Sequence, residues 1–127
     1  RVTTGIDAGA AEKLLAEIGL GGRGDLFPGQ LSLGQQRRMA LARAFATRPE
    51  LLLMDEPFVS LDPGLVDEMM GLFLRLRAET QATTLFVTHV RDEAARLASR
   101  IVTLGGPPAT VVNDVPNRAG PKGVGYC

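Results

Sequence analysis

The sequence feature that most constrains the fold is an apolar run, Leu51 to Met54, that ends in Asp55-Glu56-Pro57. Consecutive apolar residues without alternation predict a strand buried on both faces, as in a parallel sheet. Pro57 ends the strand, so Glu56 is expected at the mouth of the sheet. Two carboxylates there are costly to bury unless a cation such as Mg²⁺ on a triphosphate offsets their charge. The run alone fits equally well a strand followed by a solvated acidic turn.

Hydrophobic periodicity and turn residues predict helices and strands that alternate along the chain. We expect helices over residues 10–18, 33–47, 65–77 and 91–98, and strands over residues 51–54, 83–88, 101–104 and 109–112. This alternation predicts an α/β fold, a parallel sheet with flanking helices. The tail from Asn113 is rich in Gly and Pro, so we expect a domain over residues 1–112 and a poorly ordered segment over residues 113–127.

A serine opens the helix expected over residues 33–47. Ser32 followed three residues later by Gln35 has the pattern of a capping box. A helix start also presents free N–H groups and partial positive charge, and Gly34 would leave room for a phosphate to approach them. Taken alone, the pattern is explained by capping, because capping boxes are common.

Two further polar residues stand at the ends of expected elements. Asp62 precedes Pro63 and, taken alone, is explained as the cap of the next helix. His89 is the only histidine and follows the strand expected over residues 83–88. A lone histidine is usually structural or merely exposed, but this one would lie at the carboxyl end of a parallel strand, where α/β sheets bind ligands.

In this order and at these spacings, the four motifs resemble the ATP-binding domain of ABC transporters, from about residue 11 to about residue 112. The resemblance places Ser32, Gly34 and Gln35 in the signature motif, Leu51 to Asp55 in the Walker B strand, Ser60 to Asp62 in the D-loop, and His89 as the switch histidine. It implies ATP and Mg²⁺ as cofactors. Asp55 would then support Mg²⁺, Glu56 would activate water as the general base, His89 would contact the γ-phosphate, and Asp62 would couple two sites.

The same resemblance implies partners and a location. Two such domains pair head to tail with ATP between them, and they dock on membrane-spanning permease subunits. We therefore expect an ATPase that powers transport from the cytoplasmic face of the plasma membrane. Among such systems the chain looks most similar to the nitrate, sulfonate and taurine importers.

The sequence departs from the family pattern in one large respect. It contains no G-x-x-x-x-G-K-[ST] motif, and the glycines at positions 21, 22 and 24 follow a helix and lack the Lys-Ser/Thr pair. We therefore expect a partial P-loop NTPase fold, the C-terminal half of the domain, without the Walker A strand and loop. The start at Arg1 rather than Met agrees with that expectation. In addition, Val90 replaces an acidic residue common after the switch histidine, so the cap of the following helix is in doubt.

Composition bears on the alternative functions. Lys plus Arg and Asp plus Glu number 14 each, so no basic field favours nucleic acid as a partner. A non-transport ATPase of the DNA-repair or chromosome-maintenance type would need a long coiled coil before the signature motif, and only a short helix is expected there. A non-catalytic remnant is the other alternative, against which Glu56 and His89 argue.

We predict that this chain alone binds ATP weakly or not at all, because the loop that would cradle the phosphates is missing. Equilibrium titration with a fluorescent ATP analogue measures this affinity directly. Micromolar binding to the isolated chain would contradict the prediction.

Overall fold

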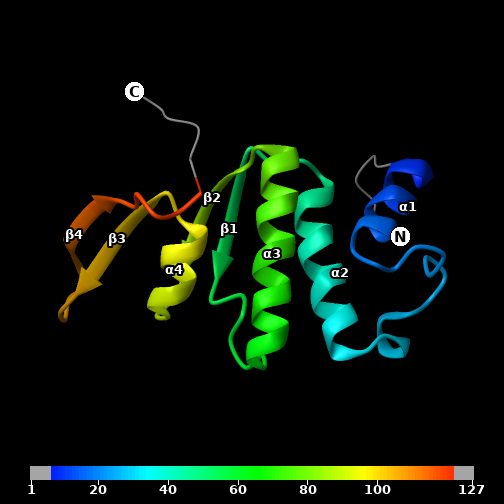
Figure 1. Cartoon of the computed structure of the whole chain (residues 1–127), viewed down its shortest axis with the longest axis horizontal. Coiled ribbons are helices and arrows are strands. Elements are labelled where there is room, and N and C mark those ends of the chain that lie inside the picture. The colour runs from blue at the N-terminus through cyan, green and yellow to red at the C-terminus, as the bar shows by residue number, and fades with distance from the viewer. Residues whose placement is uncertain (1–6, 122–127) are drawn as a thin grey trace. The chain divides into compact units, whose positions relative to one another are not determined.

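The structure, a computed structural model, describes residues 7–121, which divide into two units (Figure 1). The first unit contains the described residues up to Met54 together with Phe58–Leu85. The second contains Asp55–Pro57 and the described residues from Phe86 onward. Within residues 7–121, none of the helices combines the length and apolar character needed to cross a membrane.

Each helix and strand expected from the sequence is present, with small differences at its ends. In chain order the elements are α1 (Ala8–Glu17), a 3-10 turn (Pro28–Gln30), α2 (Leu33–Ala46), β1 (Leu51–Asp55), α3 (Pro63–Thr80), β2 (Thr83–Val87), α4 (Arg91–Leu97), β3 (Arg100–Gly105) and β4 (Thr110–Pro116).

The core of the first unit lies between helices. In the first unit, α2 packs against both α1 and α3 (Figure 1). The Phe45 ring on α2 meets the Phe73 ring on α3 at a centroid distance of 5.9 Å and a tilt of 60°. Burying an apolar side chain of this size stabilises a fold by about 2 kcal/mol. The other buried side chains of these two helices are Leu41, Ala42, Met69, Met70, Leu72 and Leu76.

β1 and β2 form a parallel pair, as the sequence predicts. Thr83 N donates to Glu50 O at 2.9 Å near the start of the pair, and Glu56 N donates to Val87 O at 2.8 Å at its end. Both strands therefore run in the same direction, and their carboxyl ends lie side by side. This arrangement sets the residues after β1 next to those after β2.

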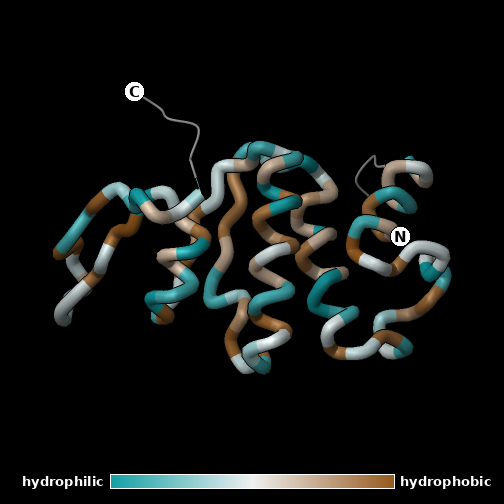
Figure 2. Tube along the Cα trace, in the orientation of Figure 1, coloured by the Kyte–Doolittle hydropathy of each residue, from teal (hydrophilic) through white to brown (hydrophobic). Residues whose placement is uncertain are grey.

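The expectation that β1 is buried on both faces is wrong for the described chain. Leu51 and Leu53 are 57% and 65% exposed, whereas Leu52 and Met54 are half-buried. On β2 the same alternation leaves Leu85 61% exposed. Figure 2 shows β1 as largely hydrophobic. Within residues 7–121, only one face of the two strands is covered, so the apolar side chains on the other face of β1 are exposed to solvent.

β3 and β4 form a separate antiparallel pair, which the alternation of helices and strands did not predict. Ile101 pairs with Val115, and the register shifts between Thr103 and Leu104. The expected disorder from Asn113 is wrong for residues 113–116, because they continue β4 and pair with β3. The remainder of the predicted tail beyond residue 121 lies outside the described residues.

An exposed ion pair joins the two strands of this hairpin. Arg100 donates from Nε and a terminal nitrogen to the two carboxylate oxygens of Asp114, each at 2.6 Å. The hydrogen bonds from Arg100 lower the pKa of Asp114. A lowered carboxyl pKa stabilises the folded form above the pKa of the unfolded chain, and that contribution is lost as the pH falls through the folded pKa.

We predict that acidification loosens the hairpin through Asp114. In an NMR titration from about pH 6 to about pH 1, amide shifts of β3 and β4 should change with the protonation of this carboxyl group. In Asp114→Asn this transition should disappear, because the group no longer titrates. A transition of equal size in both proteins would contradict the assignment.

Candidate functional site

The turn after β1 carries the two carboxylates. Asp55 is the last residue of the strand and is exposed. Glu56 follows in the left-handed region, with φ of 42°, and its amide donates to Val87 O. A non-glycine residue in this region costs about 1 kcal/mol and persists where its surroundings hold it. The hydrogen bond to β2 is one such restraint, so the position of Glu56 depends on strand pairing.

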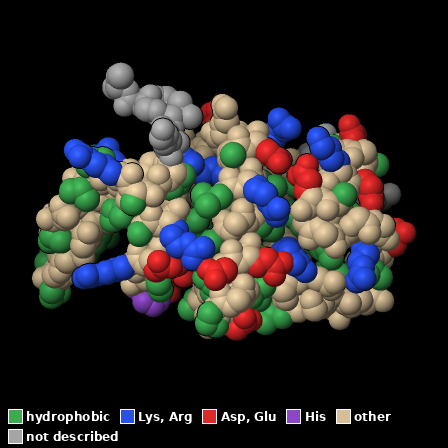
Figure 3. Space-filling model, in the orientation of Figure 1, with side chains coloured by type: hydrophobic (Ala, Val, Ile, Leu, Met, Phe, Trp, Pro, Cys, Tyr) green, Lys and Arg blue, Asp and Glu red, His purple; other side chains and the backbone are tan. Residues whose placement is uncertain are grey.

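The residues after β2 bring an imidazole to this turn. His89 Nδ1 lies 2.8 Å from Glu56 Oε1. Their side chains are 70% and 40% exposed, and Figure 3 shows the histidine at the surface (purple). An exposed pair of this kind contributes little to folding stability. The pair is a candidate site for chemistry, because a carboxylate and an imidazole lie in hydrogen-bond contact at the carboxyl ends of two parallel strands, where α/β sheets bind ligands.

The start of α2 has the predicted capping box. Gln35 N donates to Ser32 Oγ at 3.2 Å, and Ser32 N donates to Gln35 Oε1 at 2.9 Å. A Cβ atom added at Gly34 would lie 3.4 Å from a methyl group of Leu65 on α3. A side chain at position 34 would therefore meet the flexible end of Leu65 in close van der Waals contact, and this packing does not by itself require glycine. That Gly34 leaves room for a phosphate to approach the helix start stays a prediction.

Asp62 also caps a helix, because its carboxylate accepts from Leu65 N at 3.0 Å at the start of α3. Its predicted coupling of two sites is not tested by this contact. Of the predicted site residues, the structure brings Glu56 and His89 into contact in the second unit, to which Asp55 also belongs. Those at the helix starts, Ser32, Gly34, Gln35 and Asp62, belong to the first unit.

Sequence reasoning missed two polar residues behind His89. Thr88 Oγ1 donates to Glu93 Oε2 at 2.5 Å and accepts from Val90 N at 3.0 Å. Glu93 is 7% exposed, and it is the buried charged residue of the described chain. One signal was available, because Val90 has no side chain able to cap α4 and Glu93 stands three residues after it, at the position of the acidic residue of a capping box.

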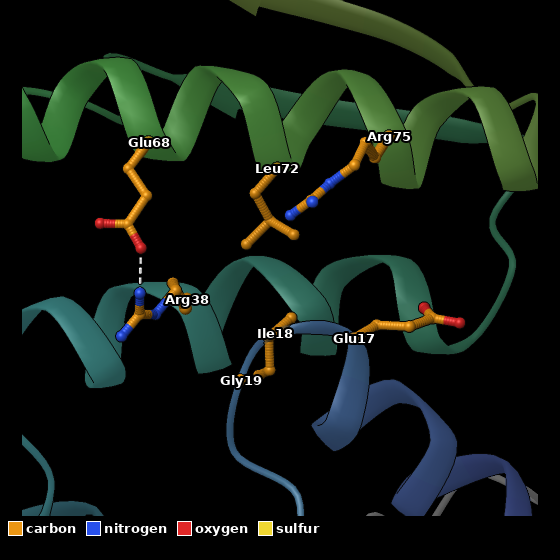
Figure 4. Close-up of a pocket in the computed structure, with 7 residues that line it drawn as sticks. All are labelled: Glu17, Ile18, Gly19, Arg38, Glu68, Leu72 and Arg75. Atoms are coloured by element: carbon orange, nitrogen blue, oxygen red, sulfur yellow. Dashed lines mark hydrogen bonds and ion pairs between the residues drawn. The ribbon is translucent and has the colours of Figure 1, made fainter.

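A separate pocket of about 220 Å³ lies in the first unit (Figure 4). Arg38 forms an ion pair with Glu68 at its edge, and the other lining residues are Glu17, Ile18, Gly19, Leu72 and Arg75. It contains none of the predicted site residues. Its mixed charges and open form give it no evident chemistry, so the strand ends remain the candidate site.

The amino-acid sequence is similar to known transport proteins. The family model described as "ABC transporter" matches residues 4–59. The chain is 46% identical over 94 residues to the trimethylamine N-oxide transport system ATP-binding protein TmoW of Pelagibacter ubique, which covers 74% of this chain and 28% of that protein. The chain belongs to the ABC transporter family. It is also 45% identical over 93 residues to the sulfate/thiosulfate import ATP-binding protein CysA of Synechococcus elongatus, which covers 73% of this chain and 27% of that protein.

Solved structures of ABC transporter proteins share the fold. An ATP-binding cassette of an ABC transporter, MJ1267, superposes with a TM-score of 0.70 at 25% identity, over 86% of this chain and 42% of that one. Its ADP conformation gives a TM-score of 0.65 at 30% identity, over 74% and 37% of the two chains. The predicted fold class is thereby confirmed. This ABC transporter chain spans less than a third of the curated relatives named above.

The narrower resemblance to nitrate, sulfonate and taurine importers is only loosely supported. The relatives are named for trimethylamine N-oxide and for sulfate or thiosulfate. Neither name contains nitrate, sulfonate or taurine.

We predict that Ser32→Ala lowers the free energy of unfolding by about 1 kcal/mol, because it removes the acceptor for Gln35 N. Ser32→Asp is the matched control, since it keeps an acceptor oxygen at the cap. Urea denaturation followed by circular dichroism measures both. An equal loss in the two variants would show that the cap does not stabilise α2.

Proposed function

We propose that this chain forms part of the ATP-binding subunit of an ABC transporter and supplies metal-binding and catalytic residues for ATP hydrolysis. The observation that carries the proposal is the 2.8 Å contact between Glu56 and His89 at the ends of two parallel strands. Membership of the family and the relatives named as ATP-binding proteins of transport systems support it. None of the relatives named above has a DNA-repair or chromosome-maintenance function in its name.

Asp55 fits the role of a ligand for Mg²⁺. Its carboxylate is exposed at the end of β1. Mg²⁺ in nucleotide sites is held by one or two carboxylates together with phosphates and waters, so it needs no cage of protein ligands. The absence of a cluster of three or more metal-binding side chains within residues 7–121 is compatible with that kind of site. When bound, Mg²⁺ would neutralise charge on the phosphate oxygens.

Glu56 fits the role of general base. Its Oε1 atom faces His89, and its Oε2 atom has no hydrogen-bond partner among the described residues. Oε2 can therefore accept a proton from a water molecule while Oε1 keeps its contact with the imidazole. A positioned base of this kind typically contributes a factor of about 10² to 10⁴ to a rate.

His89 fits the role of a contact to the terminal phosphate. With Nδ1 turned to Glu56, the other ring nitrogen, Nε2, has no partner within residues 7–121. A phosphate oxygen accepts hydrogen bonds, so Nε2 must carry a proton to bind it.

The proposed assembly uses the capped helix starts of the first unit. The start of α2, with Ser32, Gly34 and Gln35, would face ATP held by a second nucleotide-binding domain in a head-to-tail dimer. Asp62 would act across the same interface. Transmembrane permease subunits would be the other partners, and the chain would then act at the cytoplasmic face of the plasma membrane.

The test uses a chimaera in which this chain replaces the matching segment of the Pelagibacter protein. We predict that the chimaera hydrolyses ATP and that Glu56→Gln lowers turnover by about 10²-fold or more while ATP remains bound. Glu79→Gln, which neutralises an exposed carboxylate near the end of α3, is the matched control and should keep full activity.

Two outcomes would contradict the proposal. Unchanged hydrolysis in Glu56→Gln would remove Glu56 from the role of base. A folded chimaera that binds ATP and does not hydrolyse it would show that this chain does not supply the catalytic residues.

A further inference from the structure

The residue that precedes His89 is hydrogen-bonded to a buried carboxylate. Glu93 lies in the first turn of α4 and is 7% exposed, whereas its neighbour Asp92 is exposed. A buried charge is costly unless it is hydrogen-bonded, so Glu93 depends on the partner that it has. That partner is the hydroxyl group of Thr88, at 2.5 Å.

The hydrogen bonds of Thr88 have a definite direction. A hydroxyl group has one proton, and Thr88 donates it to Glu93 Oε2. Thr88 Oγ1 in turn accepts from Val90 N at 3.0 Å. These two hydrogen bonds, which share Thr88 Oγ1, thus restrain the backbone on both sides of His89. A charge-assisted bond of this length is among the stronger kinds of hydrogen bond in proteins.

We propose that Glu93 and Thr88 are positioning residues for His89, and that they hold its imidazole at the distance at which Nδ1 meets Glu56. This inference rests on the proposed function of the pair formed by Glu56 and His89. The ring of His89 is 70% exposed, so little packing restrains it. The hydrogen bonds of Thr88 restrain the backbone next to His89 in place of that packing, and they orient the imidazole toward the turn after β1.

The chain offers a clean reporter, because His89 is its only histidine. Imidazole labelled with ¹⁵N therefore gives signals from this ring alone, and no ATP or activity is needed. Glu56→Ala defines the spectrum of a His89 ring that has lost its contact. Thr88→Val and Glu93→Ala break the positioning bond, whereas Thr88→Ser and Glu93→Gln keep a hydroxyl donor and a carbonyl acceptor. Asp92→Asn neutralises an exposed carboxylate in the same turn of α4 and is the control for charge alone.

We expect Thr88→Val and Glu93→Ala to shift the His89 signals to those of Glu56→Ala. The variants Thr88→Ser, Glu93→Gln and Asp92→Asn should keep the signals of the unaltered chain. If Glu93→Ala fails to fold, as judged from its amide spectrum, Thr88→Val carries the test because it keeps the shape of the side chain.

Unaltered His89 signals in folded Thr88→Val would overturn the positioning role. A different failure would be seen if Glu56→Ala itself left the His89 signals unchanged. The contact between Glu56 and His89 would then be absent in solution, and both the positioning role and the observation that carries the proposed function would fall.

Discussion

The parallel pairing of β1 with β2 is the interaction on which the candidate site depends. Two strands separated by the whole of α3 end side by side, and the last bond of the pair joins Glu56 N to Val87 O. Without that bond Glu56 would have little reason to keep its left-handed backbone. The contact between Glu56 and His89 is thus a consequence of backbone pairing and adds little stability of its own.

Much of the local structure could be predicted from the sequence, because its causes are local. Ser32 with Gln35, and Asp62 before Pro63, specify helix starts through bonds that span three residues. The apolar run before Asp55 indicates a strand because short apolar runs bounded by turn residues are typical of strands, and that pattern too lies within one short segment. The nearness of Glu56 and His89 followed from one general rule, that parallel strands end at the same edge of a sheet.

What could not be predicted depends on contacts between distant residues. The exposure of Leu51 and Leu53 depends on which elements cover the sheet, and no pattern within β1 contains that information. The antiparallel β3–β4 hairpin extends through residues whose Gly- and Pro-containing surroundings suggested disorder. Glu93 looked like an ordinary acidic residue in a first helical turn, and only its burial against Thr88 distinguishes it from Asp92.

We propose that the paired strand ends hold a carboxylate and an imidazole for the terminal phosphate of ATP. The decisive measurement is a crystal structure of the chimaeric protein with Mg²⁺ and a non-hydrolysable ATP analogue. We expect Nε2 of His89 within hydrogen-bond distance of the terminal phosphate and Glu56 facing the same group. A phosphate bound at another edge of the protein, with Glu56 and His89 both left in solvent, would contradict it.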